Sequence, residues 1–135
     1  MNFKKLPKKI KELDKVFKLY PQIKLVYFFG SAAKEKAGPL SDYDFAFYLD
    51  EKDEKKIFET KINLAVELSK ALKTDKVDVV ILNTAESPEL KYGILKEGRL
   101  IYEKEPFRVL VEPKILNEYF DFRQTLFKNN LIKTL

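Results

Sequence analysis

Residues 23–49 read IKLVYFFGSAAKEKAGPLSDYDFAFYL, and this stretch carries the strongest signal for the fold. Its first part, Ile23 to Phe29, is a short apolar run of β-branched and aromatic residues that stops at a glycine, which favours a buried strand over a helix. Ser31 to Lys36 has the composition of a short helix, and a Gly-Pro pair ends it. The chain then extends again from Asp42 to Leu49, which predicts a second strand.

Outward from this stretch, predicted helices and strands alternate. We expect an N-terminal helix, a long central helix, a third strand, a further helix, a fourth strand and a terminal helix, in order at 7–20, 53–72, 77–82, 87–96, 99–102 and about 113–131. The helices have apolar side chains three and four residues apart, whereas the strands are short β-branched runs. This order predicts an α/β (α+β) fold, with a small mixed sheet flanked by helices and a C-terminal amphipathic helix.

Length and composition fit a single domain with its own core. The chain has 135 residues, of which 45% are hydrophobic, and one compact domain usually has about 100 to 200 residues. We find no linker, so we expect one domain over residues 1–135, with its core at about 20–104. No run reaches the roughly 18 uncharged apolar residues of a membrane span, and no apolar signal segment is present, so we expect a cytoplasmic protein without a membrane partner.

Two residue types are missing from the sequence, and this limits its chemistry. Without cysteine the chain has no disulfide, thiolate nucleophile or zinc-thiolate site, and without histidine it has no imidazole base or ligand. Demanding chemistry must therefore use carboxylates. The net charge of +5 suits an anionic partner such as a nucleotide or nucleic acid, although acidic and basic residues are interspersed, as on an ordinary soluble surface.

Three aspartates are the candidates for that chemistry. Asp42 and Asp44 are two residues apart on a predicted strand, so both side chains point to one face and Tyr43 points to the other. Two neighbouring carboxylates repel each other unless a cation neutralises them, and an all-oxygen pair suits Mg²⁺ or Mn²⁺ bound to a nucleotide phosphate. Asp78 lies within the apolar strand 77–82. If that strand is beside the second strand, Asp78 reaches the same ions; at an exposed edge it simply faces water.

Gly30 and Ser31 form a candidate phosphate-binding turn. Glycine permits a close approach of the backbone, and Ser31 begins a predicted helix whose free N–H groups attract phosphate. Taken alone, a Gly-Ser pair at a strand end is most often a turn with a helix cap, and a strand-edge Asp-x-Asp pair is often solvated. The order and spacing of the two motifs favour the functional interpretation.

Gly-Ser, ten residues and then Asp-x-Asp resembles the signature of the DNA polymerase β-type nucleotidyltransferase superfamily. The small size, the run Ser41 to Ala46 and the segment Leu95 to Glu103 are most similar to the minimal nucleotidyltransferases, or MntA-like antitoxins, over roughly residues 20 to 125. The resemblance implies catalytic and metal-binding roles for Asp42, Asp44 and Asp78, and nucleotide-binding roles for Gly30, Ser31 and Lys34.

The resemblance also implies a reaction and a partner. Such proteins resemble enzymes that transfer AMP from ATP with Mg²⁺ or Mn²⁺, and in the antitoxin branch the acceptor is a tyrosine of a HEPN-domain ribonuclease toxin. The alternatives are transfer to a small-molecule hydroxyl or an RNA end, and a non-catalytic module that neutralises a toxin by contact alone. One departure concerns nucleotide binding: family members commonly have arginines after Gly-Ser, whereas here Ala32 and Ala33 precede Lys34, a point charge without the bidentate fork of arginine.

The predicted terminal helix has a broad aromatic face, formed by Tyr119, Phe120, Phe122 and Phe127. We expect this face to cap the core. It also offers a surface to a partner such as the HEPN-type toxin, or to a second copy in a homodimer or hetero-oligomer.

Overall fold

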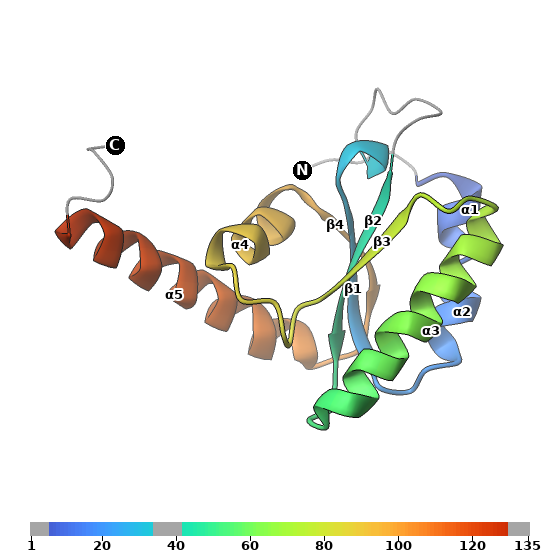
Figure 1. The fold of residues 1–135 in the computed structure, drawn as a ribbon, viewed down its shortest axis with the longest axis horizontal. Helices are drawn as coiled ribbons and strands as arrows, with labels where there is room; N and C mark the ends of the chain where they lie inside the picture. Colours follow the sequence, from blue (N-terminus) through green and yellow to red (C-terminus); the bar gives the residue numbers. More distant parts are fainter. Residues whose placement is uncertain (1–5, 34–41, 130–135) are drawn as a thin grey trace.

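A computed structural model of the chain describes residues 6–33 and 42–129 (Figure 1). Its elements are α1 (Lys8–Lys11), α2 (Asp14–Lys18), β1 (Ile23–Phe29), a 3₁₀ turn η1 (Ser31–Ala33), β2 (Tyr43–Leu49), α3 (Glu54–Leu72), β3 (Val77–Ile81), α4 (Pro88–Glu97), β4 (Arg99–Glu103) and α5 (Phe107–Lys128). All four predicted strands are present. No helix within the described ranges combines the length and apolar character needed to cross a bilayer.

The four strands form one mixed sheet in the order β3-β2-β1-β4. β1 pairs antiparallel with both β2 and β4, whereas β2 and β3 are parallel. Parallel neighbours need a long crossover connection, and α3 provides it between β2 and β3. The predicted fold class, a small mixed sheet flanked by helices, is confirmed.

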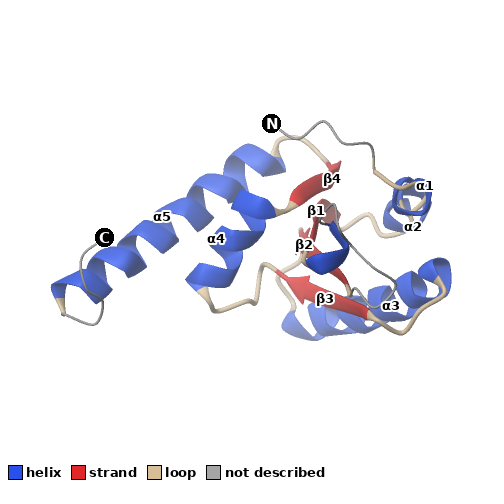
Figure 2. Cartoon of the chain, turned by 90° about the horizontal axis from the view of Figure 1, so that it is seen from above, coloured by secondary structure: helices blue, strands red, loops and turns tan. Residues whose placement is uncertain are grey.

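Helices cover both faces of the sheet (Figure 2). On one face, α1, α2 and α3 enclose a core with Phe17, Phe45 and Leu64 among its fully buried members. On the other face, α4 and α5 pack on the sheet through residues that include Ile94 and Val111. Side chains alternate between the faces along a strand, so the neighbours of Phe45 on β2 face α4 and α5.

Side-chain caps explain where two of the helices begin. The Asp53 side chain accepts a hydrogen bond from the backbone N–H of Lys55 at 3.0 Å, at the start of α3. Ser87 accepts one from the N–H of Leu90 at 3.1 Å, and Pro88 follows it as the first residue of α4. Such caps are typically worth about 1 kcal/mol, and both helices begin close to the residues predicted.

The N-terminal region differs from the single helix predicted at 7–20. Two short helices form instead, because the backbone changes to tighter bonding between them, with the N–H of Leu13 bonded to the carbonyl of Ile10 at 3.1 Å. Ile10, Leu13 and Phe17 are all at most 2% exposed. The tighter turn therefore keeps all three side chains in the core.

The terminal helix also differs from its prediction, because α5 begins at Phe107 and contains Pro113 in its interior. Proline removes the hydrogen bond to the carbonyl four residues earlier, that of Val109. The helix nevertheless continues through Pro113, and Val109 is on an exposed part of it, 70% exposed, where the loss of one backbone hydrogen bond is least costly. The predicted end of the helix near residue 131 and residues 34–36 of the predicted helix after Ser31 lie outside the described residues.

Only the first half of α5 packs on the core. Val111 and Ile115 are buried, but Phe120 is 56% exposed and Phe127 is 54% exposed. The expectation that these two aromatic residues cap the core is therefore wrong. The reason is length: a helix of 22 residues spans about 33 Å at 1.5 Å per residue, so α5 projects past the sheet (Figure 1).

A hydrogen-bonded link fixes α5 to the central strand. The hydroxyl of Tyr27 on β1 donates to Oε2 of Glu112 at 2.6 Å, and Nε of Arg108 donates to Oε1 of the same carboxylate at 3.2 Å. Burial, followed by the bond to Glu112, raises the pKa of Tyr27 far above its usual range. Tyr27 therefore remains a protonated donor, and the angle at which α5 leaves the sheet is held by a partly buried contact.

Candidate active site

The parallel pairing of β2 and β3 brings two of the three predicted aspartates together. Asp44 is directly opposite Asp78 in the register of the two strands. Both side chains point to the face of α4 and α5, since Phe45 and Val79, their neighbours along the strands, are buried in the opposite core. β3 is an edge strand, and Asp78 is exposed on it as well as adjacent to Asp44. The two positions that the sequence left open for Asp78, beside the second strand or facing water at an edge, are therefore compatible.

The turn after β1 comes directly against the Asp44 carboxylate. Phe29 pairs with Asp44 across β1 and β2, so the next residue, Gly30, lies beside that side chain. A Cβ atom at Gly30 would be 1.8 Å from Oδ2 of Asp44, and the φ angle of Gly30 is +81°, in the left-handed region. Both observations require glycine at this position. The close approach predicted for Gly30 is thus made by the protein's own carboxylate.

Ser31 connects this turn to the other aspartate of the pair. Its side-chain oxygen accepts a hydrogen bond from the backbone N–H of Asp42 at 3.1 Å. The bond places the first residue of the Asp-x-Asp motif beside the Gly-Ser turn. A serine hydroxyl that accepts one hydrogen bond keeps its own proton for donation, which suits it to a phosphate oxygen.

Tyr43, between the two aspartates, faces the other side of the sheet as predicted. Its ring stacks on Phe28 with 6.2 Å between ring centroids, and Lys9 lies with Nζ 4.6 Å from the Tyr43 centroid and contacts its hydroxyl. These contacts attach the strand that carries the aspartates to α1. They hold the backbone of the motif from the side opposite the carboxylates.

The surroundings of Asp44 disfavour the ionised form of its carboxylate. Partial burial raises its pKa above the usual value, and the negative charges of Asp78 and Asp42 raise it further. Each of these causes disfavours the ionised carboxylate, and a bound cation would remove the repulsion. The donor set, carboxylate oxygens alone, fits Mg²⁺ or Mn²⁺.

The three carboxylates are electrostatically coupled but do not form a closed set of ligands. Within residues 6–33 and 42–129, no three acidic side chains are grouped in an arrangement that could hold a metal ion. Asp42 and Asp78 are both exposed, so rotation about their side-chain bonds toward Asp44 is inexpensive. Chelation by all three therefore requires such a rotation.

Cavities flank the carboxylates on two sides. One, of about 420 Å³, is lined by Asp42 and by residues 75–78, which include Lys76 and Asp78. The other, of about 290 Å³, lies between Gly30 and one side of α4 that includes Gly93. Lys76 is not among the residues predicted from the sequence, because one lysine among many carries no signal until β3 is placed beside β2.

Five of the six predicted site residues are thus brought to one end of the sheet, and Lys34 lies outside the described residues. Residues 11–107, which include all six, match the family described as Polymerase beta, Nucleotidyltransferase. The chain belongs to this family. The protein is a nucleotidyltransferase, and the family predicted from the Gly-Ser and Asp-x-Asp motifs is confirmed.

Solved structures share the fold of this nucleotidyltransferase over nearly its whole length. A mutant MntA-HpeT toxin-antitoxin structure has a TM-score of 0.71 at 23% identity, covering 91% of this chain and 98% of that chain. A toxin-antitoxin structure with AMP-PNP has a TM-score of 0.71 at 23% identity, covering 93% and 100%. The MNT antitoxin complex with a tri-AMPylated HEPN toxin of Shewanella oneidensis gives 0.67 at 22% identity, covering 92% and 97%. The comparison with curated proteins finds no match.

Proposed function

We propose that this nucleotidyltransferase transfers AMP from ATP to a tyrosine hydroxyl of a HEPN-type toxin, and thereby acts as an antitoxin. The observation that carries the proposal is the meeting of Asp42, Asp44 and Asp78 beside the Gly30-Ser31 turn. The choice of acceptor is supported by the similarity in fold to structures described as toxin-antitoxin complexes, one of them containing an AMPylated HEPN toxin.

In this mechanism Asp42, Asp44 and Asp78 would hold a divalent cation, Mg²⁺ or Mn²⁺, when it is bound. Such an ion, when bound, neutralises phosphate charge and lowers the pKa of a nearby hydroxyl. No cysteine or histidine is present in the sequence to act as an alternative base near neutral pH. The proposed role of the three carboxylates is therefore inseparable from metal binding.

The remaining groups position the nucleotide and the acceptor. The turn at Gly30 presents backbone close to the outer phosphates, the Ser31 hydroxyl donates a hydrogen bond to a phosphate oxygen, and Lys34 and Lys76 supply positive charge. The acceptor oxygen forms a bond to the α-phosphorus, and pyrophosphate leaves with the electron pair of the broken P–O bond. Asp78, exposed at the sheet edge, orients the acceptor hydroxyl or takes its proton.

Labelled ATP tests this function directly. With ATP labelled in its α-phosphate, a HEPN-type partner and Mg²⁺, we expect label on a tyrosine of the partner, and no transfer in excess EDTA. Restoring Mg²⁺ beyond the EDTA concentration should restore transfer, which controls for denaturation by the chelator. Undiminished transfer in EDTA would show the mechanism to be wrong. Label on a small molecule or on RNA, or on nothing, would replace the proposed acceptor.

The exposed aromatic face of α5 is the proposed contact with the partner. Phe120 packs edge-on against Tyr92 and Tyr119, whose rings are stacked with centroids 3.9 Å apart. We expect Phe120→Glu to weaken association with the toxin at least tenfold, as for an interface aromatic, and to change the free energy of unfolding by less than about 1 kcal/mol, as for an exposed side chain.

Titration calorimetry and chemical denaturation measure the two effects of Phe120→Glu. Phe58→Glu on α3 is a matched control, because Phe58 is 61% exposed and Phe120 is 56% exposed. Unchanged toxin affinity in Phe120→Glu, or an equal loss in both variants, would rule out this face of α5 as the specific contact.

A further inference from the structure

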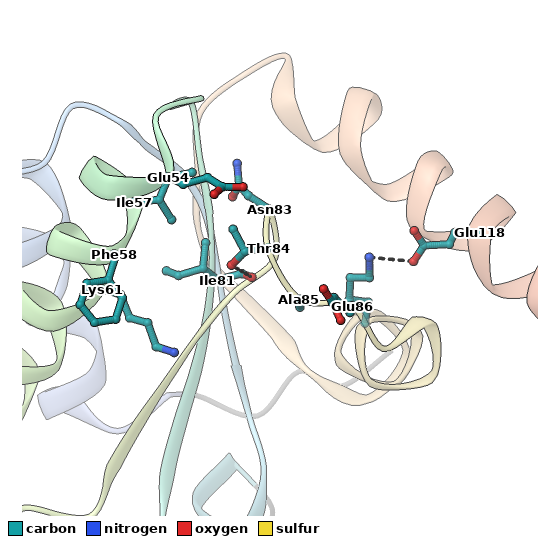
Figure 3. A pocket seen from close by; sticks show the side chains of 11 residues that line it. Glu54, Ile57, Phe58, Lys61, Ile81, Asn83, Thr84, Ala85, Glu86 and Glu118 are labelled. Carbon is teal, nitrogen blue, oxygen red and sulfur yellow. Dashed lines mark hydrogen bonds and ion pairs between the residues drawn. The ribbon is translucent and has the colours of Figure 1, made fainter.

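A two-lobed groove lies at the far end of the strands from the three aspartates. A polar lobe of about 710 Å³ and an apolar lobe of about 310 Å³ adjoin at Asn83, Lys91 and Glu118, which line both of them. The polar lobe lies between α3, the β3–α4 loop and α5 (Figure 3). Tyr48, in the apolar lobe, is four residues along β2 from Asp44, about 13 Å at the rise of a strand.

The two lobes differ in chemistry. Glu54, Lys61, Asn83, Thr84 and Glu86 are among the residues of the polar lobe. Tyr48, Leu82, Phe107, Leu110, Val111 and Ile115 line the apolar lobe. The volume of the apolar lobe, about 310 Å³, is at the lower end of the range for small-molecule sites, roughly 300 to 1,000 Å³. An occupant of both lobes must therefore have an apolar body and a polar end.

Lys91 lies where the lobes meet, and its burial is unusual for a lysine. The residue is 8% exposed, and Nζ is 2.7 Å from Oε1 of Glu118, whose own side chain is 47% exposed. The two partners are thus unequally buried: the ammonium is largely removed from water, whereas the carboxylate remains about half exposed. An ammonium has three donors, and this contact uses one of them. Figure 3 shows the ion pair at the side of the groove nearest α5.

Asn83 makes the junction between the lobes rigid. Its Oδ1 accepts from the backbone N–H of Leu49 at 3.0 Å, and its Nδ2 donates to the Leu49 carbonyl at 2.7 Å. The amide therefore extends the strand pairing at the end of β2 and leaves little freedom to the loop that follows β3. Glu118, by contrast, is on the more exposed side of the ion pair, so water can solvate its carboxylate when another anion takes its place on the ammonium.

We propose that this groove is a second binding site, for an amphipathic anion. The anionic group replaces Glu118 on the Lys91 ammonium, and the apolar body occupies the lobe beside Phe107 and Ile115. A singly charged group suits the site because Glu54 and Glu86 line the polar lobe and would repel a triphosphate. The site is therefore distinct from the proposed nucleotide site.

The fluorescent probe 8-anilinonaphthalene-1-sulfonate, a sulfonate on an aromatic body, tests the proposal with the full chain. We expect saturable binding to one site, weakened at least tenfold by Lys91→Met and strengthened several-fold by Glu118→Gln, which frees the ammonium from its partner. Each variant removes one partner of a half-buried ion pair, which can destabilise the fold, so chemical denaturation must show that both variants are folded under the conditions of the binding assay. Lys96→Met is the matched control, since Lys96 is an exposed lysine on the same helix.

Each other outcome overturns the proposal. Equal probe affinity in the wild type and in Lys91→Met would place the probe on the exposed aromatic face of α5. Weaker binding in Glu118→Gln would make that carboxylate part of the probe's site and not its competitor. Displacement by ATP, together with loss of binding in Asp44→Asn, would place the probe in the nucleotide site.

Discussion

Asp44→Asn is expected to lower AMP transfer by at least roughly a hundred- to a thousandfold, the usual cost of removing one preorganised electrostatic group from an active site. Asp44 is opposite Asp78 in the register of β2 and β3, and its carboxylate lies against Gly30. An amide of the same shape keeps the packing but removes the negative charge. Steady-state transfer of labelled AMP to the proposed HEPN-type acceptor measures the loss.

The same substitution should leave the fold at least as stable when no metal is present. The pKa of Asp44 is raised in the folded chain, so its carboxyl holds a proton more tightly there than in the unfolded chain. At neutral pH the ionised group therefore opposes folding, and the neutral asparagine removes that repulsion. In EDTA we expect the Tm of Asp44→Asn to equal or exceed that of the wild type.

The change in Tm on adding a metal ion tests whether Asp44 binds that ion, and the test does not depend on transfer activity. A cation bound only to the folded state raises Tm, so millimolar Mg²⁺ should stabilise the wild type and have little effect on Asp44→Asn. Asp50→Asn is the control, because Asp50 is an exposed aspartate at the other end of the same strand. Full activity in Asp44→Asn, or an equal response of both variants to Mg²⁺, would show that Asp44 does not hold the metal.

The site could be predicted where its geometry is local to the chain. Asp42 and Asp44 face one side because side chains alternate along any strand, and this holds without knowledge of the neighbouring strands. Asp78 is different, because its position depends on how the sheet is ordered. That order follows from the crossover through α3 and from the burial of both faces, and an apolar strand such as 77–82 pairs equally well at several places.

Two features of the fold could not be predicted from the sequence: the burial of a polar side chain, and the residue at which α5 begins. Lys91 is buried and pairs with Glu118 of α5, a contact between two helices that no local pattern encodes. Pro113 indicates a helix start by its usual preference, yet α5 begins six residues earlier, at Phe107, and Val109, the residue whose carbonyl loses its usual donor, is exposed. In both cases the environment of the residue in the folded chain, buried or exposed, overrides the preference of the local sequence.

Gly30→Ala is expected to have the second large effect, on both stability and transfer. The added Cβ would meet Oδ2 of Asp44 at 1.8 Å, and alanine at a φ of +81° is strained even where space is available. The left-handed backbone alone costs about 1 to 2 kcal/mol, so we expect a loss of at least that size in the free energy of unfolding. Transfer should fall further, since the Asp44 carboxylate must move to make room.

Gly93→Ala is the matched control, and it should change stability in the opposite direction. Gly93 is inside α4, and a Cβ there would meet no atom within 4 Å. Alanine in a helix interior is favoured over glycine by roughly 0.5 to 1 kcal/mol, so this variant should be slightly more stable than the wild type. Chemical denaturation of both variants measures the two changes, and a destabilised Gly93→Ala would show that the effect at Gly30 is not specific to the turn.

A double variant separates the backbone strain at Gly30 from the contact with Asp44. In Gly30→Ala with Asp44→Ala, the carboxylate that meets the new Cβ is absent, whereas the strained φ angle remains. Gly30→Ala should therefore cost less stability in the Asp44→Ala background than in the wild type, by a coupling free energy of about 1 kcal/mol or more. Strict additivity would mean that Gly30 is needed only for its φ angle. The proximity of the Gly-Ser turn to the Asp-x-Asp pair would then have no energetic role in the fold.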